Sequence, residues 1–196
     1  MSGRRRRWGW FLLGVGLVLS LLSPVLSPDR TYVYRDTLVY WAPVNRVLRE
    51  ALLEQRLPEW DSTQYAGVPF LANPATQTLY PARWASALAT SHPAKANEVF
   101  AFMHLLLALM GGVALGRELG LDRAPRRVLA VTYLLSGPMV SLLGNPGYLV
   151  GASWLPLSLA WILRARRKLP SGEGSSVRAL ALAAAGAAAE GFIETP

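Results

Sequence analysis

A stretch of 36 residues without a charged side chain, residues 128–163, is the feature that most constrains the fold of this chain. About 20 apolar residues in a helix cross a hydrocarbon core of roughly 30 Å, and 36 residues would form a helix of about 54 Å, too long for one crossing. Four turn-forming residues, Gly-Asn-Pro-Gly at 144–147, stand near its middle. The stretch is therefore predicted to be two short membrane spans joined by a tight hairpin.

Three further apolar runs extend this pattern. Residues 8–26 are uncharged and follow four consecutive arginines, and residues 99–116 are interrupted only by His104. An alanine-rich run at 179–189 begins a fifth span. The predicted fold is an all-α integral membrane protein, a bundle of about five spans with a long first extracytoplasmic loop. A cleavable signal peptide is the alternative for residues 8–26, but a small-x-small cleavage site is missing there.

The distribution of basic residues predicts the orientation of these spans. Thirteen of the 20 Lys and Arg residues fall in segments 1–7, 117–127 and 164–178, and such segments are typically cytoplasmic. The N-terminus is then cytoplasmic and the loop of residues 27–98 is extracytoplasmic. Anionic lipid accounts for this basicity, so no nucleic acid is expected as a partner. The absence of cysteine excludes a disulfide-rich module and a cysteine-ligated zinc site.

The predicted organisation has three parts. Residues 1–26 form the basic N-terminus and first span, residues 27–98 the extracytoplasmic loop, and residues 99–196 the remaining spans, of which the last is incomplete. The sequence is accordingly expected to be the N-terminal part of a longer protein. The loop contains juxtamembrane amphipathic helices, one of them beginning near Pro43. Its apolar residues recur at helical spacing opposite charged ones: Val44, Val47, Leu48, Ala51 and Leu52 against Arg46, Arg49, Glu50, Glu54 and Arg56.

Asp36 is the candidate functional carboxylate near the start of the loop. Two interpretations are open: a structural helix cap or ion pair with Arg35, or a carboxylate that faces a substrate at the bilayer boundary. Glu98 is predicted to pair with Lys95, and His104 to form an interhelical hydrogen bond. No metal-ligand spacing, Ser/His/Asp arrangement or phosphate-binding loop is present.

The segment LPEWDSTQYAGVPFLANPATQTLYP, residues 57–81, is the most specific part of the chain. Its proline, glycine and asparagine residues break helical and strand periodicity, while its aromatic residues favour an ordered loop. With the early Asp36, the amphipathic helix and the charge-free pair of spans, it resembles the N-terminal part of the YfhO family of bacterial membrane proteins. The similarity covers nearly all of residues 30–165. That family is related to the C-type (GT-C) glycosyltransferases, which use lipid-phosphate-linked sugars.

The resemblance implies transfer of a sugar from a polyprenyl-phosphate donor to a cell-envelope acceptor at the outer face of the membrane. Asp36 matches the acidic residue that acts as general base or positions a metal in related enzymes, so the need for a divalent cation stays open. The lipid bilayer and the lipid-linked sugar are the expected partners. The candidate substrate-binding residues are Arg35, Trp60, Asp61, Gln64, Tyr65, Asn73, Gln77 and Tyr80. The alternative is a non-catalytic membrane scaffold, or a transport-related protein whose loop binds lipid or a partner.

Overall fold

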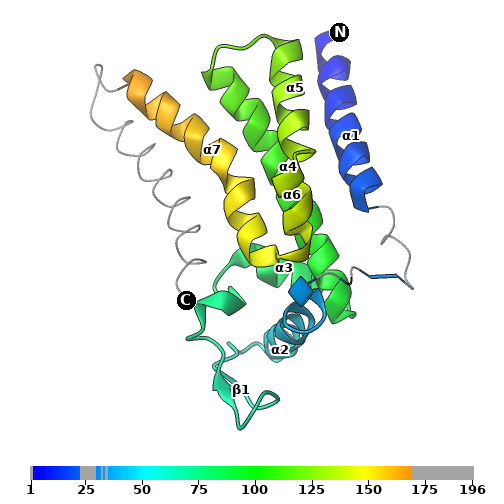
Figure 1. Cartoon of the computed structure of the whole chain (residues 1–196), viewed down its shortest axis with the longest axis vertical. Helices are drawn as coiled ribbons and strands as arrows, with labels where there is room; N and C mark the ends of the chain where they lie inside the picture. Colours follow the sequence, from blue (N-terminus) through cyan, green and yellow to red (C-terminus); the bar gives the residue numbers. More distant parts are fainter. Residues whose placement is uncertain (1, 23–29, 32, 34, 169–196) are drawn as a thin grey trace.

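The computed structural model describes residues 2–22, 30–31, 33 and 35–168, and this part of the chain is mostly helical. The long helices lie along one another, and the shorter helices α2 and α3 lie across one end of them (Figure 1). The long helices are α1 (Ser2–Leu22), α4 (Pro93–Glu118) and α7 (Pro146–Lys168), and α5 (Arg123–Leu134) with α6 (Gly137–Ser141) forms a fourth, interrupted one. The shorter helices are α2 (Trp41–Leu53) and α3 (Pro81–Ala89).

Three helical segments are long and apolar enough to cross a membrane: Pro93–Glu118, Arg123–Gly144 and Pro146–Arg167. The last two are the predicted pair within residues 128–163, and the break between them falls at Asn145, as the turn residues predict. The first of the two is not one continuous helix. Pro138 has no N–H to donate to the Leu134 carbonyl four residues before it, so α5 ends at Leu134. The segment continues as α6, which has Pro138 in its first turn, and as the 3-10 helix η4 (Leu142–Gly144).

Helix α1 covers residues 8–22 of the first predicted span. Residues 23–26 of that span, and the predicted fifth span at 179–189, lie outside the described residues. α1 packs closely on α4 because Gly14 has no side chain: a Cβ there would meet Leu109 Cδ2 at 2.4 Å. Val18 of α1 is buried in a core shared with α4, α5 and α7, whose members include Leu105, Leu134 and Leu149.

The amphipathic helix predicted near Pro43 is confirmed as α2. Val44, Val47, Leu48 and Ala51 are buried, while the charged residues of the opposite side are exposed or half-buried. This buried face forms a second core with side chains from the loop and from α3. The core comprises Trp41, Val44, Val47, Leu48, Phe70 and Ala87.

Segment 57–81 is ordered and irregular, as predicted, and it also contains a small antiparallel hairpin. Strand β1 (Trp60–Asp61) pairs with β2 (Val68–Pro69), so that Asp61 lies opposite Val68. The hairpin extends away from the long helices (Figure 1). Gly67 has a φ of 104° and lies under the Trp60 indole, where a side chain would clash. A 3-10 helix, η3 (Pro74–Thr76), leads toward α3, and Asn73 caps it by accepting a hydrogen bond from the Ala75 N–H.

Candidate functional site

Arg83 is the centre of the layer that α2, α3 and the intervening loop form across the helix ends, here called the end layer (residues 35–92). Its side chain is fully buried. The guanidinium carbon lies 4.3 Å from the ring centroid of Trp41 in α2 and 3.6 Å from that of Phe100 in α4. Nη2 donates a hydrogen bond of 2.6 Å to Gln77 Oε1. Since both rings attract the cation, Arg83 joins α3 to α2 and α4.

The electrostatics around Arg83 are unusual for a buried group. Its Nε and Nη1 atoms have no hydrogen-bond partner among the described residues, and no carboxylate pairs with it there. Burial lowers the pKa of Arg83 to about 9, against the opposing effect of the nearby Tyr80 and Tyr40 hydroxyls. The side chain is therefore charged at neutral pH. Burial also raises the pKa of Tyr40 and of Tyr80, so both stay neutral beside it.

A chain of hydrogen bonds connects the end layer to α4 and α7 through Tyr80. His104 Nδ1 lies 2.8 Å from the Phe100 carbonyl, which can only accept, so Nδ1 carries the proton. Nε2 then accepts from the Tyr80 hydroxyl at 2.8 Å, and the same hydroxyl accepts from Trp154 Nε1 at 3.0 Å. The hydrogen-bonding role predicted for His104 is thus present, although its side-chain partner is a residue of the end layer and not of a spanning helix.

A second polar connection holds the segment around Asp36. Asn45 Nδ2 donates to Asn97 Oδ1 at 2.9 Å, and Asn97 Nδ2 donates to the Thr37 carbonyl at 3.1 Å. This fixes the 3-10 helix η2 (Arg35–Thr37) against α4, and η2 also contacts η4 at the end of the segment Arg123–Gly144. The Asp36 side chain is exposed, and its backbone carbonyl accepts from the Tyr40 N–H at 2.9 Å. Asp36 therefore lies at the junction between the end layer and the apolar helices.

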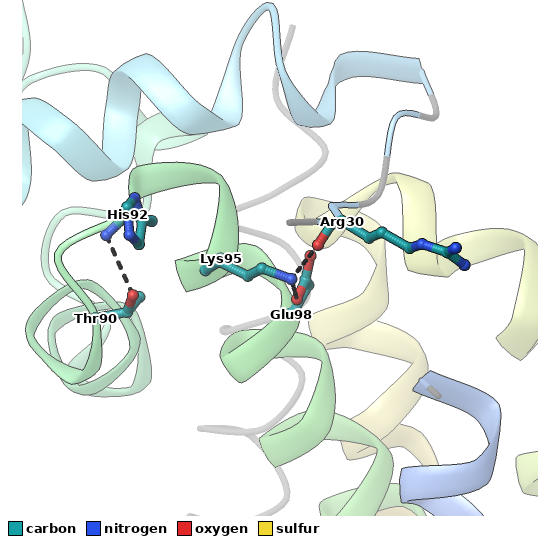
Figure 2. Close-up of polar contacts among 5 residues, drawn as sticks. All are labelled: Arg30, Thr90, His92, Lys95 and Glu98. Carbon is teal, nitrogen blue, oxygen red and sulfur yellow. Dashed lines mark hydrogen bonds and ion pairs between the residues drawn. The ribbon is translucent and has the colours of Figure 1, made fainter. Parts of the chain in front are cut away.

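The predicted pair of Lys95 and Glu98 is confirmed. Lys95 Nζ donates to Glu98 Oε2 at 2.9 Å and also to the carbonyl of Arg30 (Figure 2). Figure 2 also shows the His92 N–H directed at Thr90 Oγ1, at 3.1 Å, just before α4 begins. The lysine consequently connects the chain ahead of η2 to the first turns of α4.

The structure divides the predicted site residues among three places. Arg35 and Asp36 lie on η2, and Asn73, Gln77 and Tyr80 lie around Tyr40 and Arg83. The hairpin holds the others, Trp60, Asp61, Gln64 and Tyr65.

Within the hairpin, the environments of two residues differ sharply. Asp61 is buried, and its Oδ1 accepts from the Thr63 N–H at 2.8 Å and the Thr63 hydroxyl at 2.6 Å, so one carboxylate oxygen stabilises the turn. Tyr65, in contrast, is 97% exposed. The first residue suits a structural role, and the second is open to contact with a partner.

Sequence reasoning did not identify Arg83, although a signal was available. Arg83 is the one charged residue in segment 62–94. A solvent-exposed loop does not require a charge at one particular position, so a single arginine in an otherwise uncharged segment indicates a structural role. Its aromatic neighbours Trp41 and Phe100 come from segments 42 residues before it and 17 after it, so only the fold brings them together.

The described part of the chain is a helical protein with three helices suited to a membrane, capped by an ordered polar and aromatic layer. Within residues 2–22, 30–31, 33 and 35–168, no three His, Asp or Glu side chains are grouped so that they could hold a metal ion. Comparisons with protein-family models, with curated proteins and with solved structures found no match.

Proposed function

We propose that this chain belongs to a YfhO-like inner-membrane protein with about five spans in this part, a cytoplasmic N-terminus and residues 27–98 outside the membrane. Its function is to transfer a sugar from a polyprenyl-phosphate donor to a cell-envelope acceptor. The observation that carries the proposal is the exposed Asp36 carboxylate on η2, at the boundary between the apolar helices and the end layer. The phosphate of a lipid-linked donor lies at the membrane–water boundary, and the proposal puts that boundary at η2.

The chemistry assigned to Asp36 is that of a general base. As the acceptor hydroxyl attacks the anomeric carbon, its proton passes to the carboxylate and the bond from that carbon to the phosphate oxygen breaks. The polyprenyl phosphate leaves with the electron pair, the configuration at the anomeric carbon inverts, and Asp36 later returns its proton to water. Arg35 is the cation next to this carboxylate in the chain and is assigned to the leaving phosphate.

Positioning of the base depends on its neighbours. The hydrogen bond from Asn97 to the Thr37 carbonyl, together with that from the Tyr40 N–H to the Asp36 carbonyl, holds the backbone of Asp36 and of the residue after it. A general base is effective only when its oxygen is held within hydrogen-bond reach of the proton it removes. These two bonds supply such restraint to a three-residue turn.

The test is Asp36→Asn in the full-length protein, assayed for sugar transfer in membranes. Asparagine keeps the shape of aspartate but cannot accept the proton, so we expect the transfer rate to fall roughly 10²–10⁴-fold at unchanged protein level. The matched control is Glu54→Gln, which removes an exposed carboxylate from the same layer, where it pairs with Arg56. Transfer at the wild-type rate by the Asp36→Asn protein would remove this residue from the mechanism.

Donor binding provides a measurement independent of turnover. A ligand that binds only the folded state raises the melting temperature, so a polyprenyl-phosphate sugar should stabilise the wild-type protein against heat. Stabilisation of both wild type and Asp36→Asn, with transfer lost only in the variant, supports the proposed roles. If the donor stabilises neither protein, the non-catalytic scaffold is the better description.

A further inference from the structure

The hairpin of β1 and β2 presents an aromatic ring on its outer face. Asp61 and Val68 are paired across the hairpin, and Asp61 is buried, so this face of the two strands is turned inward. Trp60 and Pro69 form the neighbouring pair, and both are exposed. Since successive residues of a strand point to opposite faces, Trp60 and Pro69 lie together on the outer face. The Trp60 side chain is 57% exposed there.

Contact with Gly67 holds the Trp60 ring in place. A Cβ on Gly67 would lie 2.4 Å from Trp60 Nε1 and 2.7 Å from Cε2, so this edge of the indole rests against the glycine. The turn is closed by a hydrogen bond of 2.9 Å from the Gly67 N–H to the Gln64 carbonyl, and by the two bonds that Asp61 accepts from Thr63. A ring that is already held loses little conformational freedom when a ligand covers it.

The surface of the hairpin is aromatic and neutral. Asp61 is the one charged residue in segment 60–69, and it is buried. Next to this segment, the exposed Glu59 and Arg46 have opposite charges. The side chains at 62–64 are two hydroxyls and an amide. An aromatic face attracts the C–H groups of a sugar ring, and hydroxyl and amide groups bond to sugar hydroxyls, so this surface suits an uncharged sugar better than a phosphate.

The place of the hairpin argues against a lipid as the occupant of its outer face. The hairpin extends from the end layer away from the long helices, which include the segments suited to cross a membrane (Figure 1). An aromatic ring that anchors a protein at the membrane interface would lie beside the ends of those helices. In the proposed orientation, the hairpin is in the extracytoplasmic space, where cell-envelope glycans are found.

We infer that the outer face of the hairpin binds a neutral glycan, with the Trp60 indole stacked on one of its sugar rings. The hairpin and η2 lie apart within the end layer (Figure 1), so a ligand that meets both is a chain of several sugars. In naming this glycan as the acceptor of the transfer, the inference rests on the proposed function. The binding step is separate from the transfer and is measured without turnover.

The first experiment is calorimetric titration of the full chain with cellohexaose or chitohexaose, both neutral, in a detergent without a sugar headgroup. Trp60→Phe keeps a ring and should bind within about threefold of the wild type, whereas Trp60→Leu keeps apolar bulk without a ring and should bind about tenfold more weakly. The matched control is Leu53→Ala, which removes an exposed apolar side chain of α2 in the same layer and should leave binding unchanged.

A second measurement keeps Trp60 in place, so it serves even if the Trp60 variants do not fold. Ser62→Cys introduces a single thiol at an exposed position of the hairpin, because the chain has no cysteine. Saturating chitohexaose should slow the reaction of this thiol with a maleimide about threefold or more, since a bound ligand excludes water from its surroundings. The reaction of Leu119→Cys, after α4, should be unchanged.

The inference is wrong if neither oligosaccharide binds or protects Ser62→Cys. It is also wrong if Trp60→Leu binds as tightly as Trp60→Phe, which would indicate a contact that needs only apolar surface, as with a protein or a lipid.

The same measurements separate this inference from the proposed function. Asp36→Asn should bind both oligosaccharides as the wild type does. If transfer depends on Asp36 but binding does not depend on Trp60, the inference alone fails. If the wild type binds through Trp60 but transfers no sugar, the proposed function alone fails.

Discussion

At Arg83 a single guanidinium joins three helices, and the consequence is testable by substitution. Lysine keeps the charge but cannot lie flat between the rings of Trp41 and Phe100 or keep the bond to Gln77. We expect Arg83→Lys to lower the free energy of unfolding by about 2–4 kcal/mol, because two buried cation–π contacts are lost while a charge stays buried. The measurement is the melting temperature of the full chain in detergent micelles.

Arg56→Lys is the control for this substitution. Arg56 is exposed and pairs with Glu54 in the same surface turn, an interaction of about 0–1 kcal/mol. Its melting temperature should stay close to that of the wild type. An Arg83→Lys protein as stable as the Arg56→Lys protein would mean that any cation at position 83 suffices and that the ring geometry is unimportant.

Prediction from sequence was uneven at the scale of single residues. The pair of Lys95 and Glu98 is three residues apart on one helix, so it follows from helical spacing alone. The bonds from Tyr80 to His104 and from Asn45 to Asn97 join residues 24 and 52 positions apart, and no local periodicity contains them. Asp36 could be singled out as a lone carboxylate, but its place beside η4 depends on how the loop folds back.

At the scale of helices, the close contact between α4 and α5 depends on Gly112. A Cβ added there would lie 2.8 Å from the Ala130 Cα and 3.0 Å from its Cβ. Backbone atoms cannot move aside cheaply, so Gly112→Ala should force the two helices apart and destabilise the protein by about 1–3 kcal/mol. The melting temperature in detergent and the yield of monodisperse protein both measure the effect.

Gly16→Ala in α1 is the matched control, because a Cβ there would meet nothing within 4 Å. Alanine is the better helix former by about 1 kcal/mol, so this variant should be as stable as the wild type or more so. If Gly112→Ala behaves like Gly16→Ala, the approach of α4 to α5 is looser than the geometry indicates.

Helix positions were predicted well where the apolar pattern was strong, as in α2 and in α4. The interruption between α5 and α6 was missed because a charge-free run shows hydrophobicity but hides helix breaks. Ser136, Gly137 and Pro138 were the local signal for it. The hairpin at 60–69 was missed for another reason: two strands of two residues each are too short to show alternation.

The two ends of the whole molecule differ in chemistry. One end carries the end layer, with its buried arginine, aromatic rings and hydrogen-bonded side chains. The other end carries an excess of arginines at the termini of α4, α5 and α7, with Trp10 of α1 stacked 3.8 Å from the guanidinium of Arg127. This asymmetry follows from the chain order of the charged segments, so it could be predicted from sequence.

Orientation in the membrane is the prediction that belongs to this scale. The chain has no cysteine, so Ser62→Cys in the hairpin and Leu119→Cys after α4 each introduce a single thiol at an exposed position. Because basic segments stay on the cytoplasmic side, a membrane-impermeant maleimide added to intact spheroplasts should label the Ser62→Cys protein and not the Leu119→Cys protein. Permeabilisation should expose the second thiol, which controls for its reactivity. Labelling of Leu119→Cys alone in intact spheroplasts would reverse the topology and place Asp36 in the cytoplasm, away from any extracytoplasmic acceptor.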